Sequence, residues 1–216
     1  MRIYDCEQGS EKWHKIRCGR PTASNFSKIL TAARLELSKS RIKYAIQLAA
    51  DIKGVASVPP PPTAAMEWGI ENEPLAVADY ENRNGVVCEK VGFVYPDESS
   101  MWGCSPDRIV LDSAGERVGL LECKCPNVET LIEYSLSDEV PSEYRLQVQG
   151  QLWITGLDWC DFFVFHPDLR DVVQIRVEPD EQVFEAFETH IPAFCKEVIA
   201  LSERINLAVD WSSLNA

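Results

Sequence analysis

The order of the predicted elements places the chain in the α/β (α+β) class, with a mixed central β-sheet flanked by helices. Three observations predict this class. Apolar residues recur at helical spacing through residues 1–84, alternation with a period of two follows, and helical spacing returns between and after the later strands. We therefore expect one domain over residues 1–216, with a helical N-terminal part and with the sheet and its flanking helices in 85–216.

The helices of the N-terminal part are predicted from capping residues and helix breakers. Ser10 and the hydroxyls of 22–24 precede apolar residues at helical spacing, and Asn84-Gly85 ends the last helix. Pro74 is expected to interrupt or bend that helix, because proline has no backbone N–H. The four predicted helices occupy 10–17, a segment that begins at 22–24, 39–53 and 63–83. An extended connector is expected at 58–62, where four consecutive prolines occur.

The strands are predicted from period-two alternation and from turn residues. Gly115 marks a turn between two of them, and Pro126 ends the second of these. The expected strands are 86–95, 102–104, 107–112, 118–125, 159–166 and 171–178. Helices are expected within 127–136, at 142–155 with Ser142 as N-cap, and from 179–180 to about 206.

The composition excludes several classes of protein. With 45% apolar and 25% charged residues, 11 Gly and 13 Pro, the chain is not collagen-like, disordered or a coiled coil. No apolar run approaches the length of a membrane span, about 18 residues, and the N-terminus has no apolar signal region. We therefore expect no membrane partner and a cytoplasmic location. Eight cysteines without paired spacing are typical of reduced thiols.

The charge is distributed unevenly along the chain. There are 21 Lys and Arg against 34 Asp and Glu, a net charge of -13. Residues 1–54 hold 11 basic and 5 acidic residues, a local charge of +6, so the other 162 residues carry -19. The total argues against a protein that coats nucleic acid, whereas the basic segment 1–54 is a candidate site for a polyanion. The alternative is that these basic side chains only solvate helix faces.

Two acidic residues and a lysine are expected to converge on one face of the sheet. Asp107 lies on one predicted strand, and Glu122 and Lys124 lie on the next. Residues i and i+2 of a strand share a face, so Glu122 and Lys124 project together, and a hairpin through Gly115 brings Asp107 beside them. Carboxylates are the ligands that Mg²⁺ or Mn²⁺ prefer, and an ammonium beside the metal suits phosphodiester hydrolysis. For these residues alone, a surface ion pair is the alternative.

The same residues belong to a series of motifs in a fixed order. Ser-Pro-Asp followed by Glu-x-Lys on the next strand is the pattern of the PD-(D/E)XK nucleases. The other motifs are EQG, WHKIR, TAS, WG with Glu71 and Glu73, CSPD, LECKCP and LQVQGQLWIT. Together they resemble the YqaJ-type viral recombinase family of alkaline exonucleases, the lambda-exonuclease-like enzymes, from about Asp5 to the last helix. The resemblance implies a single nuclease domain with a restriction-endonuclease-like core.

The resemblance also implies a metal site. Two Mg²⁺ ions are implied per active site, with Mn²⁺ able to substitute. Asp107, Glu122 and the main-chain carbonyl of Cys123 would bind metal, and Glu73 would support the second ion or its waters. The sequence departs from the family at Cys123, where only the carbonyl is needed, and at Arg108, where the family often has Gly. Arg108 therefore changes the charge next to the implied metals.

Further implied roles concern the reacting phosphate and the DNA end. Lys124 would orient or activate the attacking water, and Gln147 would contact the nucleophile or the scissile phosphate. Arg17, Ser24 and Ser105 would recognise the terminal 5′-phosphate of the strand that is digested. This last role has independent physical support, because Ser24 is expected at a helix start, which favours an anion, and Arg17 offers a planar fork.

The function implied by the resemblance is a Mg²⁺-dependent exonuclease that degrades one strand of double-stranded DNA from its ends, 5′ to 3′, to mononucleotides. It would leave a 3′ single strand for phage-type recombination by single-strand annealing in a bacterial cell. The implied partners are DNA ends, two further copies of the chain in a homotrimeric ring, and a single-strand annealing protein. Two alternatives stay open: a PD-(D/E)XK endonuclease of the restriction or repair type, and a catalytically silent DNA-end-binding module.

Overall fold

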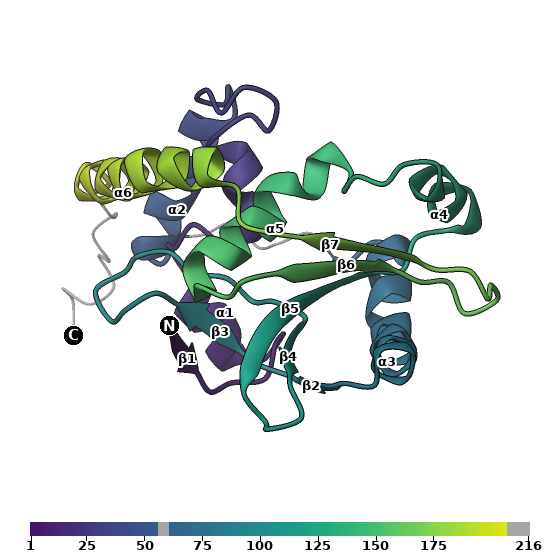
Figure 1. The fold of residues 1–216 in the computed structure, drawn as a ribbon. Coiled ribbons are helices and arrows are strands. Elements are labelled where there is room, and N and C mark those ends of the chain that lie inside the picture. Colours follow the sequence, from purple (N-terminus) through teal and green to yellow (C-terminus); the bar gives the residue numbers. More distant parts are fainter. Residues whose placement is uncertain (56–60, 207–216) are drawn as a thin grey trace.

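A five-stranded mixed sheet lies at the centre of the structure, with helices on both of its faces (Figure 1). The computed structural model describes residues 1–55 and 61–206. Neighbouring strands are antiparallel except β5 and β6, which are parallel. In spatial order the strands are β2 (Val87–Glu89), β4 (Arg108–Leu111), β5 (Arg117–Lys124), β6 (Cys160–Val164) and β7 (Val173–Val177). The predicted α/β class with a mixed sheet flanked by helices is confirmed.

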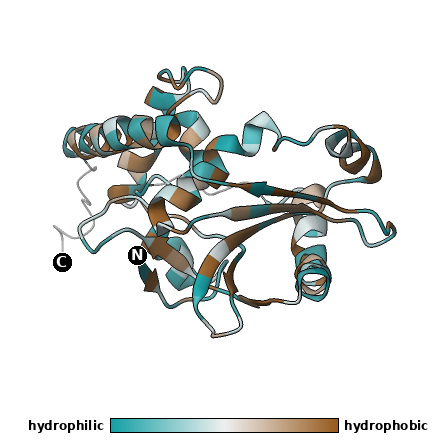
Figure 2. Ribbon diagram, in the orientation of Figure 1, coloured by the Kyte–Doolittle hydropathy of each residue, from teal (hydrophilic) through white to brown (hydrophobic). Residues whose placement is uncertain are grey.

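The helices form two layers, one on each face of the sheet. On one face lies α3 (Ala64–Asn84), whose Tyr80 packs edge-on against Phe163 of β6 in the smaller of two apolar cores. The larger core lies on the opposite face, beneath α5, and includes Ile109 and Leu120. Most of its helical residues come from η1 (Ala23–Lys28), α2 (Arg41–Ile52), α5 (Ser142–Thr155) and α6 (Glu181–Glu203). Figure 2 shows that the strands between the two layers are mostly hydrophobic.

The parallel pairing of β5 with β6 explains why α5 lies across the sheet. Parallel neighbours need a crossover connection, because a tight hairpin joins only antiparallel strands. Here α4 (Val128–Ser135) and α5 form that crossover (Figure 1). Side chains on the inner side of α5 therefore face β5, the strand that carries Glu122 and Lys124.

Capping residues set most helix bounds as the sequence predicts. Ser10 caps α1 (Glu11–Arg17) by accepting a hydrogen bond from the Trp13 N–H, and Gly85 ends α3 with a left-handed φ of 63°. A helix begins after Thr22, as predicted, but it is a six-residue 3₁₀ helix. The predicted N-cap of α5 is wrong, because Pro141 takes that position and Ser142 is the first residue of the helix.

The predicted strand at 86–95 is in fact two strands that belong to two sheets. β2 joins the main sheet, whereas β3 (Phe93–Tyr95) pairs with β1 (Arg2–Tyr4), a strand that the sequence pattern did not predict. The break lies near Gly92, where a Cβ atom would come within 2.3 Å of the Cys6 carbonyl oxygen. The predicted strand at 102–104 is also absent, and this segment makes only isolated bridges, to Thr22 and to Val94.

Two expectations concern the chain outside these elements. Part of the predicted proline connector, residues 58–60, lies outside the described residues, and 61–63 are irregular. Across the described ranges, none of the helices combines the length and the apolar character that crossing a membrane requires.

Candidate active site

The predicted acidic residues meet where β4 begins and β5 ends. Because these strands are antiparallel, with Arg108 opposite Leu121, the residue that precedes β4 lies beside the last residues of β5. Asp107 is this residue; it lies just before β4, and not on a strand as predicted. Its Oδ2 accepts a hydrogen bond of 2.7 Å from the Cys123 N–H. The backbone therefore fixes Asp107 against the strand that carries Glu122.

Glu122 is the centre of the polar cluster. Its side chain is buried, and the residue is 1% exposed. Its Oε1 accepts hydrogen bonds from Lys124 Nζ and from Gln147 Nε2, and its Oε2 accepts one of 2.7 Å from Gln151 Nε2. Gln147 and Gln151 lie one turn apart on α5 and so point to the same strand. The structure thus brings Gln147 and Gln151 to Glu122, whereas the predicted contact of Gln147 with the nucleophile or the scissile phosphate stays a prediction.

The cluster concentrates negative charge in a buried place. Burial raises the pKa of Asp107 well above its usual range, the neighbouring carboxylates Glu122 and Glu73 raise it further, and Lys124 opposes them. Burial alone would lower the pKa of Lys124, but the carboxylates of Glu122 and Asp107 outweigh burial and raise it. Lys124 is therefore an ammonium cation at neutral pH, paired with Glu122, and Asp107 is the acid whose charged form the cluster disfavours.

Glu73 reaches the same place from the opposite layer. It lies on α3, which continues through Pro74 as a helix. Its Oε1 accepts a hydrogen bond of 2.7 Å from an Arg108 guanidinium nitrogen, and the pKa of Asp107 is raised in part by its charge. Polar side chains from α3 and from α5 thus meet where β4 begins and β5 ends.

A cavity of about 550 Å³ opens beside these residues. Glu73, Asp107 and Lys124 line it, and Lys124 Nζ lies 4.9 Å from the centre of the Tyr144 ring. Its other lining residues are Ala65, Met66, Gly69, Ile70, Cys123, Cys125, Pro126, Tyr134 and Tyr144. A cavity of this size has room for a nucleotide and for metal ions next to the acids.

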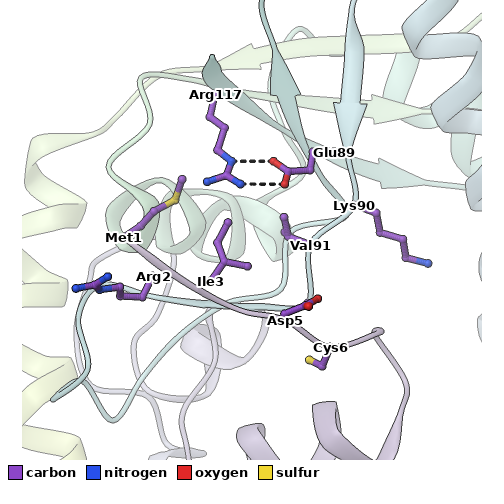
Figure 3. Close-up of a pocket in the computed structure, with 10 residues that line it drawn as sticks. Met1, Arg2, Ile3, Asp5, Cys6, Glu89, Lys90, Val91 and Arg117 are labelled. Atoms are coloured by element: carbon purple, nitrogen blue, oxygen red, sulfur yellow. Dashed lines mark hydrogen bonds and ion pairs between the residues drawn. The ribbon is translucent and has the colours of Figure 1, made fainter. Parts of the chain in front are cut away.

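A second cavity, of about 470 Å³, lies at the N-terminal end of the chain (Figure 3). Arg117 and Glu89 pair beside it through two hydrogen bonds of 2.7 and 2.9 Å, and Arg2 and Lys90 also line it. None of the predicted catalytic or phosphate-binding residues lines this cavity.

The donor atoms at the first cavity suit a hard divalent cation. Asp107 and Glu73 line it with carboxylate oxygens, the ligands that magnesium prefers, and Glu122 lies buried next to Lys124, which also lines it. Within residues 1–55 and 61–206, however, no three His, Cys, Asp or Glu side chains form a ready-made set of ligands. The carboxylates of Glu122 and Glu73 are instead held by the side chains described above.

Arg17 and Ser105 form a second polar cluster next to the acids. Ser105 lies two residues before Asp107, and its Oγ accepts hydrogen bonds from Arg17 (3.1 Å) and from the Trp13 indole N–H (2.9 Å). The Arg17 guanidinium lies 4.0 Å from the centre of the Trp13 ring, and burial lowers its pKa. None of the ion pairs between the described residues includes Arg17. An unpaired, largely buried guanidinium is suited to an anion.

Ser24 does not take part in the hydrogen bonds that link Arg17 and Ser105. Its Oγ lies 3.2 Å from the Thr22 hydroxyl and accepts a weaker bond from Asn25, and the described contacts do not join it to Arg17 or Ser105. The segment is nevertheless tied to the one before Ser105, because the Ala23 N–H donates to the Gly103 carbonyl at 3.0 Å. Ser24 does lie at a helix start, as expected, but this is a six-residue 3₁₀ helix, which has only a small dipole to favour an anion.

Three residues of the site were not among the predicted site residues. Gln151 has the clearest signal, because it follows Gln147 by one helical turn. Arg108 was noted only as a departure from the family pattern. Trp13 gave no signal, because its contact with Ser105 joins residues 92 positions apart in the chain.

Comparison with known proteins agrees with the sequence motifs. Residues 12–158 match the YqaJ-like viral recombinase domain family. A search of curated proteins gave no match. Among solved structures, an alkaline exonuclease from Laribacter hongkongensis is 33% identical, with a TM-score of 0.78 over 90% of this chain and 95% of that one. A complex of that exonuclease with dAMP matches equally well.

A phage-related exonuclease from Haemophilus somnus 129PT is 13% identical, with a TM-score of 0.66 over 87% of this chain and 96% of that one. At this identity the likeness concerns the fold alone. The family match, over residues 12–158, covers well over half of the chain and includes the residues that meet where β4 begins and β5 ends. The chain therefore belongs to the YqaJ-like viral recombinase family, within the PD-(D/E)XK nuclease superfamily.

Proposed function

We propose that the protein is a Mg²⁺-dependent 5′-to-3′ exonuclease that degrades one strand of double-stranded DNA from its ends to mononucleotides. The family and the likeness to alkaline exonuclease support the class of enzyme, a DNA exonuclease. One observation supports the finer proposal. Ser105 accepts a hydrogen bond from the unpaired guanidinium of Arg17, and Asp107, two residues later, belongs to the cluster of carboxylates around Lys124. The proposed anion site at Ser105 and the proposed hydrolytic site at Asp107 are thus only two positions apart in the sequence.

In this proposal each side chain has a defined task. Asp107, Glu122 and the Cys123 carbonyl would hold one ion, and Glu73 would support a second ion or its waters. Bound Mg²⁺ supplies positive charge at the scissile phosphate and lowers the pKa of water, and Mn²⁺ can replace it. Lys124, as a cation, orients the attacking water and stabilises negative charge that develops on the phosphate. Gln147 fixes Glu122 and donates toward the reacting group.

The proposed polarity rests on Arg17. Its guanidinium is largely buried, donates to Ser105 and is not balanced by a carboxylate among the described residues. A terminal 5′-phosphate would supply the missing negative charge and accept hydrogen bonds from Arg17, Ser105 and, from the adjoining 3₁₀ helix, Ser24. Binding the end in this way places the first phosphodiester of that strand at the acids.

The proposed biological setting is phage-type recombination in the cytoplasm of a bacterium. The exonuclease would leave a 3′ single strand, and a single-strand annealing protein would take it up. A homotrimeric ring around the DNA would place the basic segment 1–54 toward the duplex and the acidic remainder toward solvent. The test of the ring is the mass in solution, which should be three times 24.3 kDa.

The experiment that tests the function uses linear duplex DNA labelled at either end, with 5′-phosphate or 5′-hydroxyl termini, beside a covalently closed circle. We expect Mg²⁺-dependent release of mononucleotides from 5′-phosphorylated ends and an intact circle. Arg17→Ala should reduce the preference for the 5′-phosphate over the 5′-hydroxyl end, because it removes the proposed phosphate ligand.

Three results would contradict the proposal in different ways. Cutting of the circle would identify an endonuclease. Binding of DNA ends without cleavage, in Mg²⁺ and in Mn²⁺, would identify a silent end-binding module. Release from 3′ ends would leave the exonuclease class intact and overturn the role of Arg17.

A further inference from the structure

Arg108 introduces a cation into the acidic site from the α3 side. It opens β4 opposite Leu121, and side chains alternate along a strand, so Arg108 and Val110 face α3 while Ile109 faces the other core. The residue is 8% exposed. Its stem therefore lies in the layer between the sheet and α3, and only its head can reach the site.

The Arg108 guanidinium is bound to Glu73, the residue that would support the second ion. One of its nitrogens donates to Glu73 Oε1 at 2.7 Å and to the main-chain carbonyl of Asp107 at 2.5 Å. The Glu73 side chain is 30% exposed and that of Arg108 10%, so water screens this pair only in part. The contact with the Asp107 main-chain carbonyl holds the Arg108 guanidinium next to Glu73 and Asp107.

The two carboxylate sites consequently differ in what a metal ion must displace. At Glu122 the competing groups are one ammonium and two neutral amides. At Glu73 the competitor is a largely buried guanidinium, which cannot lose its proton and has its stem held between the sheet and α3. An ion that takes Glu73 as a ligand must break this pair and then remain near a second positive charge.

We propose that Arg108 competes with the second divalent cation for Glu73, so that the two ions bind with unequal affinity and the cation concentration controls how many sites are filled. This inference rests on the two-ion site of the proposed function. Arg108 is a positioning residue in this scheme: it holds Glu73 until the second ion replaces it. The rate of hydrolysis then follows the weaker site, at Mg²⁺ concentrations above those that fill the first.

The test measures ion binding directly, without DNA or turnover. MgCl₂ is titrated into the full-length chain by calorimetry, and MnCl₂ binding is followed by electron paramagnetic resonance. The variants are Arg108→Gln, which keeps a hydrogen-bond donor and removes the charge, and Arg108→Met, whose apolar stem suits the layer beneath α3. Arg117→Gln is the matched control, because Arg117 is also paired with a glutamate but lies outside the site.

We expect the wild type to bind a tight and a weak ion. Arg108→Gln and Arg108→Met should bind the weak ion at least about fivefold more tightly, with the tight ion changed less than twofold, because the competing charge is gone. Arg117→Gln should match the wild type, and Glu73→Gln should lose the weak site. A wild type that binds a single ion supports the proposal if either Arg108 variant gains a second.

The inference is overturned if the weak ion binds equally to the wild type and to whichever Arg108 variants fold, as judged by circular dichroism. Failure of the proposed function would look different. In that case neither ion binds to the wild type or to any variant, in Mg²⁺ or in Mn²⁺.

Discussion

At the scale of single residues, Lys124 shows how burial and charge compete. Burial disfavours an ammonium, yet two carboxylates within the same cluster reverse this effect and raise the pKa of Lys124. The residue is therefore a positive charge at neutral pH. In the proposed function this charge orients the attacking water and stabilises the phosphate, so the effect should be lost whenever the charge or its position is lost.

Lys124→Ala should lower the single-turnover rate of DNA cleavage by roughly 100-fold or more, because it removes a cation aimed at the reacting phosphate. Binding to 5′-phosphorylated ends should persist, since Arg17 and Ser105 are untouched. The measurement is rapid-quench cleavage with enzyme in excess, beside end binding by fluorescence anisotropy in Ca²⁺. Lys90→Ala, an exposed lysine in the second cavity, is the control. Wild-type cleavage by Lys124→Ala would refute the catalytic assignment.

At the scale of elements, the close packing of α5 on η1 joins the two halves of the site. Gly150, in α5, lies against η1: a Cβ atom there would come within 2.8 Å of the Phe26 ring and 3.0 Å of the Ala23 Cβ. The glycine thus allows α5 to deliver Gln147 to Glu122 while η1 holds Ser24 near the segment of Ser105.

Gly150→Ala should therefore destabilise the protein by about 1–3 kcal/mol, because overpacking outweighs the gain in helix propensity, which is about 1 kcal/mol. Gly69, in α3, is the matched control: nothing lies within 4 Å of its Cβ position, so Gly69→Ala should stabilise by up to about 1 kcal/mol. Urea unfolding followed by circular dichroism measures both. The packing argument fails if the two substitutions shift the midpoint in the same direction.

Asp180 makes the start of α6 sensitive to acid. Its Oδ1 accepts from the N–H groups of Gln182 and Val183, and its Oδ2 from Arg145 of α5 at 2.8 Å. Burial raises the pKa of Asp180, but these hydrogen bonds and the Arg145 charge outweigh burial and lower it. A carboxyl whose pKa is lowered on folding adds stability above its unfolded pKa, about 3.9, and loses it as the pH falls through the folded value.

Asp180→Ala should lower the free energy of unfolding by about 1 kcal/mol at pH 7, the usual cost of a lost N-cap. The difference from the wild type should shrink steadily below about pH 4, where the wild-type carboxylate becomes protonated. Urea unfolding at pH 7, 5, 4 and 3 measures it. A difference that stays constant over this range would show that the charge of Asp180 contributes nothing.

What the sequence predicts well is local. Capping residues and glycines correctly predicted where α1, α3 and α6 lie. The shared face of residues i and i+2 in a strand, together with one hairpin, predicted that Glu122 and Lys124 lie beside Asp107. What it missed depends on which distant segments meet. β1 pairs with β3 across 90 residues, and the Arg108–Glu73 pair forms only because α3 covers the face of the sheet that Arg108 shares. Period-two alternation alone does not say which sheet a strand joins.

At the scale of the whole molecule, the charge separates by region. Residues 1–54 carry +6 on a chain whose net charge is -13. Several of the cations in this segment are exposed and belong to none of the ion pairs between described residues: Lys12, Lys15, Lys28, Arg34, Lys39 and Lys43. Free exposed cations on an acidic protein are the part that a DNA backbone would attract.

The double variant Lys39→Glu/Lys43→Glu should therefore weaken DNA binding and flatten its dependence on salt, because each phosphate contact contributes about -0.9 to the slope of log K against log salt. Lys90→Glu/Arg170→Glu makes the same change in net charge outside the segment, at exposed positions, and should leave the slope near that of the wild type. Fluorescence anisotropy between 50 and 300 mM NaCl, in Ca²⁺ to prevent cleavage, measures both slopes. Equal losses in the two variants would mean that DNA responds to the total charge and that segment 1–54 has no special role, whereas a loss confined to the first places the duplex along this segment.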